Sequence, residues 1–439
     1  MYPFTTALVR LAAGISGGDG QSSLNTVVQR WPEKFIHVIP AGTQECKLDF
    51  TPGGVMNKAV QTLYQGQAKI EELESIRGMA ALLVVFYHIP NWNPLFDIGI
   101  VRSGYLMVHL FFVLSGFVIY NAYAARIDSA QDLMRFQFLR FGRLYPVHLL
   151  FLLVYVLFEV AKYVGQARLG IVSPNSQPFR ENSVTALVQQ IFLVQAIGPA
   201  GHPTSFNTPA WSISVEFYAY LIFGAIVLCL PRIKNLLFSL LAMASLLMLV
   251  TNATFGFGDL LKCLAGFFIG CLTAFTVQRL PLAFPRALSL ILFAAIVAFL
   301  HWKTSERYDA VIYLLSALLI ASVVAVKDGY LNRLLNLKAL TWLGAVSYAV
   351  YMSHVAVIWV LSQVMRVVLK KPEAMIGERS TPQLSVVEVI IAWGLLIAIV
   401  LVISALVQRF VETPLRARSR RLAERWWRAE THPASRQVT

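Results

Sequence analysis

The first residues that could do chemistry are an arginine and a histidine in one apolar segment. Residues 74–90 read ESIRGMAALLVVFYHIP, in which ten apolar or small residues separate Arg77 from His88. On an α-helix this spacing corresponds to about 20° beyond three full turns, so both side chains point the same way, about 16 Å apart along the axis. Two interpretations fit the pair alone. The two side chains could line one functional face of the helix, or Arg77 could be an anchor at the membrane interface and His88 a hydrogen-bonded core residue.

A carboxylate lies within another apolar segment. Residues 208–223 read TPAWSISVEFYAYLIF, and Glu216 has Ser212 four residues before it and Tyr220 four residues after it, on one helical face. A charged group in such a segment is costly and implies a partner. That partner could belong to a functional site or to a structural ion pair with another helix.

Two arginines lie one helical turn apart in FLRFGRLYPVHLL, residues 138–150. Arg140 and Arg143 are predicted at the cytoplasmic mouth of a helix, where their guanidinium groups could hold phosphates. Ordinary positive flanking charge is the alternative.

A stripe of polar side chains follows in LGAVSYAVYMSH, residues 343–354. Ser347, Tyr351 and His354 fall at positions i, i+4 and i+7 of one helical face, and Tyr348 lies beside them. Helix packing through small and aromatic residues would explain the same pattern.

Long apolar segments must position these groups. The chain is 57% hydrophobic and 14% charged, whereas a soluble domain carries roughly 25% charged residues. Because long apolar runs recur without strand-like alternation, we predict an all-α membrane protein with about ten transmembrane helices. The predicted spans are 76–92, 104–124, 144–164, 210–230, 235–251, 259–277, 285–301, 308–326, 340–362 and 386–409.

The distribution of positive charge predicts the orientation. With both termini in the cytoplasm, the inner loops and the tail carry about twice as many Arg and Lys residues as the outer loops. The net charge of +14 therefore reflects membrane topology, and we expect no nucleic-acid partner. The four cysteines form no CxxC pair, so we expect neither a metal site nor a disulfide framework.

Three regions are expected along the chain. Residues 1–70 are mixed in polarity and predict a poorly ordered N-terminal extension without a good signal peptide. Residues 71–416 form the transmembrane domain, and residues 417–439 form a basic cytoplasmic tail.

Taken together, six stretches resemble the acyltransferase 3 family of bacterial membrane O-acyltransferases. They occur in the family's order between about residues 71 and 416: LESIRGMAALLVVFYH, LFFVLSGFVIY, FLRFGRLYPVH, TPAWSISVEFYAYLIF, LGAVSYAVYMSH and FVETPLR. The resemblance implies a multi-pass protein of the bacterial inner membrane. It also implies transfer of an acyl group, commonly acetyl, from acyl-CoA to a hydroxyl of a carbohydrate, a lipid-linked glycan or a similar acceptor. We expect a stand-alone transferase.

The resemblance also implies roles for individual residues. The arginine and histidine of the family's first helix match Arg77 and His88, which makes them the expected functional pair. His88 would accept the proton of the acceptor hydroxyl. Glu216 would orient or charge-balance His88 or Arg77.

The expected donor contacts lie on two other helices. Arg140 and Arg143, together with Arg77, would bind the phosphates of acyl-CoA. Tyr348, Tyr351 or Ser347 would donate a hydrogen bond to the oxyanion.

A proton-coupled transporter is the alternative class, because buried Arg, His and Glu residues also serve proton-coupled carriers. Transporters often contain internal repeats, and the sequence shows none. A purely structural protein would need no such polar set within its membrane segments.

Overall fold

The structure is a computed structural model that describes residues 70–170, 175–326, 328–377 and 379–428. The described residues belong to one compact unit that begins at Ile70. The predicted N-terminal extension, apart from residue 70, lies outside the described residues, as does the tail from residue 429 onward.

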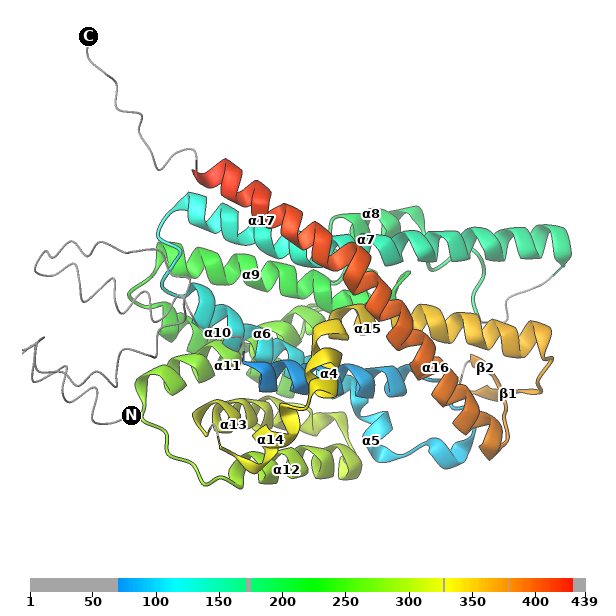
Figure 1. Ribbon diagram of the computed structural model, residues 1–439. Coiled ribbons are helices and arrows are strands. Elements are labelled where there is room, and N and C mark those ends of the chain that lie inside the picture. Colours follow the sequence, from blue (N-terminus) through cyan, green and yellow to red (C-terminus); the bar gives the residue numbers. More distant parts are fainter. Residues whose placement is uncertain (1–69, 171–174, 327, 378, 429–439) are drawn as a thin grey trace, which may run out of the picture. The chain divides into compact units, whose positions relative to one another are not determined.

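This unit is built almost entirely from helices (Figure 1). The longer helices are α4 (Glu71–His88), α6 (Met107–Tyr123), α7 (Ala130–Leu169), α9 (Trp211–Cys229), α10 (Lys234–Val250), α11 (Gly258–Arg279), α12 (Leu288–Trp302), α13 (Val311–Ala325), α15 (Lys338–Gln363), α16 (Val386–Val407) and α17 (Thr413–Arg428). The shorter ones are α5 (Gly99–Arg102), α8 (Val184–Ile191) and α14 (Tyr330–Leu335), and π-helical turns extend α15 over Val364–Val368 and α16 over Gln408–Glu412.

A helix lies at each of the ten predicted span positions, but the count of ten is not confirmed. Among the described residues, seven helices are long and apolar enough to cross a membrane. Of the other three, α10 and α12 are apolar but short, and the first turns of α4 carry several charged residues. The predicted cytoplasmic location of both termini stays a prediction.

Local signals explain where the site helices begin and end. Helix α4 ends at His88 because Ile89 precedes Pro90, and a residue before proline avoids the helical conformation. Helix α7 is longer than predicted, since its polar first half continues into the apolar span. It begins after Ser129, whose side chain accepts a hydrogen bond from the Asp132 backbone N–H, and it ends at Gly170 with φ +64°.

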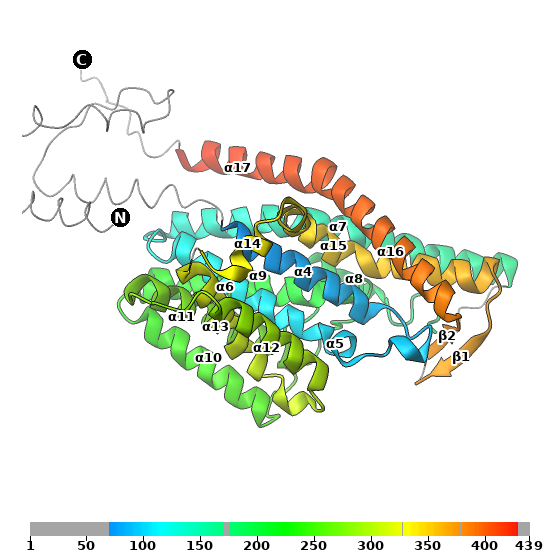
Figure 2. The ribbon, with the colours of Figure 1, turned by 60° about the horizontal axis from the view of Figure 1, so that its bottom comes forward.

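Helices α4 and α15 pack side by side (Figure 2). Their close approach depends on two glycines: a Cβ added at Gly78 would lie 2.6 Å from the Gly344 backbone nitrogen, and a Cβ added at Gly344 would lie 2.2 Å from the Glu74 carbonyl oxygen. Small residues permit such close helix contacts in membrane proteins. This contact fixes the spacing of the two helices that carry most of the predicted site.

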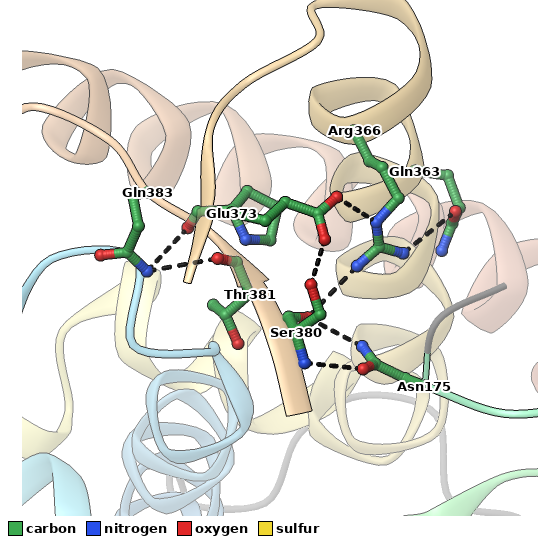
Figure 3. A network of polar contacts seen from close by, with 8 residues as sticks. Asn175, Gln363, Arg366, Glu373, Ser380, Thr381 and Gln383 are labelled. Carbon is green, nitrogen blue, oxygen red and sulfur yellow. Dashed lines mark hydrogen bonds and ion pairs between the residues drawn. The ribbon is translucent and has the colours of Figure 1, made fainter. Parts of the chain in front are cut away.

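An antiparallel hairpin of β1 (Glu373–Ile376) and β2 (Arg379–Pro382) follows α15, where the sequence predicted only an outer loop. Polar contacts anchor it, as Figure 3 shows. Arg366 donates to Glu373 at 2.6 Å, and Ser380 exchanges backbone hydrogen bonds with the Asn175 side chain at 2.8 and 2.9 Å. The hairpin therefore ties the end of α15 to the segment that follows α7.

Helix α17 continues from α16 and packs along the first half of α7 (Figure 1). The contact is close at Gly142, where an added Cβ would lie 2.2 Å from the Ser419 side-chain oxygen. Phe138 packs against the rings of Trp426 and Trp427. The start of the predicted basic tail is thus part of the folded unit.

Candidate active site

Five of the seven predicted site residues surround one cavity between α4, α6, α7, α9 and α15. This cavity, which we call the arginine cavity, has a volume of about 80 Å³. The predicted residues that line it are Arg77, Arg143, Glu216, Tyr348 and Tyr351. Segments from five parts of the sequence thus place two guanidinium groups and a carboxylate within a helical bundle. Enclosed charges of this kind are typical of functional sites in membrane proteins.

Two hydroxyl groups hold the Glu216 carboxylate. Its Oε1 atom accepts hydrogen bonds from Ser115 Oγ and from Tyr220 Oη, both at 2.5 Å. The two hydroxyl oxygens lie 2.9 Å apart, so the three groups form a closed triangle. The same-face spacing of Glu216 and Tyr220 was visible in the sequence, but the contribution of Ser115 from α6 was not.

Arg143 is the positive centre of the cavity. It interacts electrostatically with Glu74, Glu412 and Glu216, which lie on α4, on the turn after α16 and on α9. Glu412 is almost completely buried and also interacts with Arg77. Glu412 lies in the stretch FVETPLR, which contributed to the family resemblance, but Glu412 itself was not predicted to belong to the site.

Arg77 lies about three turns before His88 on α4 and forms an ion pair with Glu74 at 2.8 Å. Arg140 does not line the arginine cavity. Its guanidinium donates to Tyr123 Oη at 3.2 Å and lies over the Tyr123 ring. The arginine pair of α7 is therefore split, because one member faces the cavity and the other packs against α6.

The hydroxyl groups of α15 already have partners. Tyr348 donates to the Leu144 carbonyl at 2.5 Å, and Tyr351 contacts both the Pro209 carbonyl and Ser212 Oγ, at 3.0 and 2.8 Å. Ser347 donates to the Gly344 carbonyl at 2.8 Å. A role as an oxyanion donor would require Tyr348 or Tyr351 to exchange its partner.

His88 lies outside the lining of the arginine cavity and forms a pair with His354 of α15. The His88 Nδ1 atom is 3.2 Å from His354 Nε2, and the two ring centroids are 4.8 Å apart. His354 is fully buried and lies one turn beyond Tyr351, with ring centroids 6.0 Å apart. Sequence analysis placed His354 on the correct stripe but did not predict that it meets His88, which depends on how α4 and α15 pair.

The contacts of the histidine pair determine which nitrogens carry protons. His88 Nδ1 is 2.9 Å from the Val84 carbonyl and His354 Nδ1 is 3.2 Å from the Val350 carbonyl. A carbonyl oxygen can only accept, so both Nδ1 atoms are protonated. His354 Nε2 is then a bare acceptor for His88 Nδ1–H, and the neutral His88 ring keeps a free lone pair on Nε2. In this tautomer, Nε2 is the ring nitrogen of His88 that can accept a proton.

No group of three or more His, Cys, Asp or Glu residues among the described positions is arranged to hold a metal ion.

The fold and site define a class: a polytopic helical protein with a charged cavity and a histidine pair enclosed by apolar helices. The family model for the acyltransferase domain of the acyltransferase 3 family matches residues 70–409. The chain belongs to this family.

Several characterised or named proteins are similar to this chain. A peptidoglycan O-acetyltransferase of Listeria monocytogenes is 24% identical over 389 residues, covering 79% of this chain and 56% of its own length. A putative peptidoglycan O-acetyltransferase of Bacillus subtilis is also 24% identical, covering 79% and 55%. The acyltransferase MdmB of Streptomyces mycarofaciens is 33% identical over 166 residues, covering 35% and 38%.

The chain spans little more than half the length of the two peptidoglycan O-acetyltransferases. No solved structure matches the chain significantly.

Proposed function

We propose that the protein is a bacterial inner-membrane O-acyltransferase that moves an acetyl group from acetyl-CoA to a hydroxyl of a cell-envelope glycan. The observation that carries this proposal is the position of the His88–His354 pair, one turn beyond a cavity that holds Arg77, Arg143 and Glu216. The names of the Listeria and Bacillus relatives support both the acetyl group and the glycan acceptor.

In the proposed reaction, His88 Nε2 takes the proton from the acceptor hydroxyl while its oxygen attacks the thioester carbonyl carbon. The new C–O ester bond forms and the C–S bond breaks. His88 then returns the proton to the departing thiolate of CoA, so charge and atoms balance. The Val84 carbonyl and His354 Nε2 both accept from His88 Nδ1–H and so favour the tautomer that leaves Nε2 free to act.

The arginine cavity would receive the thioester end of the donor. At about 80 Å³ it is smaller than ordinary cavities for whole ligands, which start at about 300 Å³. Arg77 and Arg143 would stabilise negative charge there, and Tyr348 or Tyr351 would donate to the oxyanion after exchanging its partner. Arg140, one turn before Arg143 on α7, would contact the CoA phosphates outside the cavity.

The proposal is tested by mass spectrometry of envelope glycans from cells that express the intact protein, the His88→Ala variant or neither. A mass increase of one acetyl group that appears only with the intact protein would support the proposal and identify the acceptor. His301→Ala is the matched control, because His301 is exposed and lines neither the arginine cavity nor the histidine pair.

Acetyl-CoA turnover in purified membranes separates this proposal from the transporter alternative. A transferase consumes the thioester in proportion to the ester formed. Movement of a substrate without thioester consumption, or full transfer activity in His88→Ala membranes, would overturn the proposed mechanism.

A further inference from the structure

A second and larger cavity lies at the other end of α4. Its volume is about 320 Å³, within the range of cavities that bind small molecules. Residues of the α4 end, the following loop and α16 line it, including Phe86, Asn91, Trp92, Phe96 and Trp393. We call it the tryptophan cavity.

Aromatic rings form one side of the tryptophan cavity. The Trp393 ring packs against Phe86 and Phe96, with centroid distances of 5.1 and 5.0 Å. Such a surface binds a flat, partly apolar face, while the indole N–H supplies one polar contact. A sugar ring presents C–H groups on its face and hydroxyl groups at its edge, so it matches both properties.

Three residues of this lining carry buried polar atoms without a partner among the described residues: Asn91 Oδ1, Trp92 Nε1 and Trp393 Nε1. Buried polar atoms are normally hydrogen-bonded, and each unpaired one needs an explanation. A ligand that satisfied all three atoms would donate to an amide oxygen and accept from two indole groups. A hydroxyl group does both, whereas an alkyl chain does neither.

The charges around the tryptophan cavity are balanced. Asp97 and Arg102 are the charged residues of its lining, and they pair with each other at 3.3 Å on the exposed side. The cavity therefore favours a neutral ligand over a phosphorylated one.

The hairpin region holds the loop of this cavity in place. The Leu384 backbone N–H donates to the Trp92 carbonyl, and the Asn93 side chain donates to the Leu384 carbonyl, both at 2.9 Å. Leu384 is two residues beyond the anchored strand β2, and Gln383, between them, belongs to the network in Figure 3. A loop fixed in this way is preorganised, which reduces the entropic cost of binding.

The tryptophan cavity also adjoins His88. Tyr87 and Ile89, the residues directly before and after His88, both belong to its lining. The Tyr87 and His88 rings meet edge to face, with centroids 4.9 Å apart. The histidine pair thus lies between this cavity and Tyr351 of the arginine cavity.

We infer that the tryptophan cavity is the acceptor site and binds a neutral saccharide ring, stacked on Trp393 and hydrogen-bonded by Asn91 and the two indole groups. This assignment rests on the proposed function, because only a transferase would use the bound saccharide as an acceptor. It adds the location of the acceptor, its chemical class and the residues that recognise it.

Binding is measured by saturation-transfer NMR on the full chain in lipid nanodiscs, because sugar-based detergents would compete. The ligands are the methyl glycosides of glucose, galactose, mannose, rhamnose and N-acetylglucosamine. We expect at least one to bind, and Trp393→Phe or Asn91→Ala to weaken it about five- to tenfold, as expected for one lost hydrogen bond. Trp302→Phe, at an exposed tryptophan of α12, is the matched control and should not change binding.

The outcomes separate this inference from the proposed function. Saccharide binding that depends on Trp393 and Asn91, without any ester product, would retain the site and overturn the transferase proposal. Ester formation with an acceptor KM unchanged in both variants would retain the transferase and overturn the site. Binding of hexanol but of no glycoside would assign the cavity to alkyl chains and also overturn the inference.

Discussion

His354 offers the sharpest test of the site, because it contacts His88 without lining the arginine cavity. In His354→Ala, His88 Nδ1–H loses the acceptor at 3.2 Å but keeps the Val84 carbonyl at 2.9 Å. The lost hydrogen bond alone is worth about 1 kcal/mol, roughly a fivefold change in rate. Freedom of the His88 ring adds to this, since a misplacement of about 1 Å can cost about 100-fold. We therefore expect kcat to fall about 10- to 100-fold, with little change in KM for the acceptor.

The assay is steady-state acetyl transfer by protein in nanodiscs, combined with ¹³C and ¹⁵N NMR of labelled histidine. His354→Gln retains an oxygen that can accept from His88 Nδ1–H and should recover most of the lost activity. His148→Ala is the control for loss of a buried histidine, because His148 bonds the Gln190 carbonyl and lines neither cavity. In the NMR spectrum, His354→Ala should increase the share of the Nε2–H tautomer of His88, because the Val84 carbonyl is then the acceptor that remains for Nδ1–H. A purely structural role would leave this share unchanged.

The double variant decides whether His354 acts through His88. If it does, His354→Ala should have no further effect on transfer in a His88→Ala background. An equal fold-loss in both backgrounds, or an unchanged His88 tautomer with full activity, would refute the reasoning.

Three further predictions concern the surroundings of the site. Gly344→Ala should destabilise the protein by about 1–3 kcal/mol and separate α4 from α15. Gly394→Ala, in open space on α16, is the control and should not destabilise it. Unfolding in detergent measures the stability of both variants, and equal stability would contradict the close contact. Glu216→Gln should lower the transfer rate more than it lowers the free energy of unfolding, because the amide oxygen still accepts from Ser115 and Tyr220 but carries no charge opposite Arg143. Transfer kinetics and unfolding are measured on the same preparation, and an equal loss of rate and stability would contradict this prediction. Slight burial alone would raise the pKa of Glu373, but hydrogen bonds from Ser380 and Arg366 outweigh it and hold this pKa below its usual value. Anchoring of the hairpin is therefore retained above about pH 4.5 and lost as the pH falls below that. Hydrogen-exchange protection factors of the β1 and β2 amides, corrected for the intrinsic pH dependence of exchange, should fall in acid for the parent chain and stay constant over this range in Glu373→Gln.

Features within one helix were predictable from the sequence, because helical geometry converts spacing into direction. The predicted common face of Glu216 and Tyr220 became a hydrogen bond, and Ser347, Tyr351 and His354 follow one stripe of α15. The positions of the helices were predictable for a similar reason, since apolar length is a local property, although seven of the described helices, and not ten, are long and apolar enough to cross a membrane. The polar first half of α7 was missed because it packs on α17, a contact that hydropathy does not reveal.

Features that depend on pairing between distant helices were not predictable. The meeting of His88 and His354 needs the register of α4 against α15, which the Gly78–Gly344 contact sets. The tryptophan cavity combines the loop after α4 with Trp393, about three hundred positions later in the chain. Its local signal was the polar and aromatic sequence HIPNWNPLF at the end of the first span.

The two cavities on either side of the histidine pair have a consequence for the order of kinetic steps. Since their linings share no residue, the proposed donor and acceptor could be bound at the same time. The acetyl group can then pass directly from donor to acceptor in a ternary complex, without a covalent acetyl-enzyme intermediate. Initial-rate plots at several fixed acceptor concentrations should accordingly give intersecting lines, whereas parallel lines are the signature of a covalent ping-pong route.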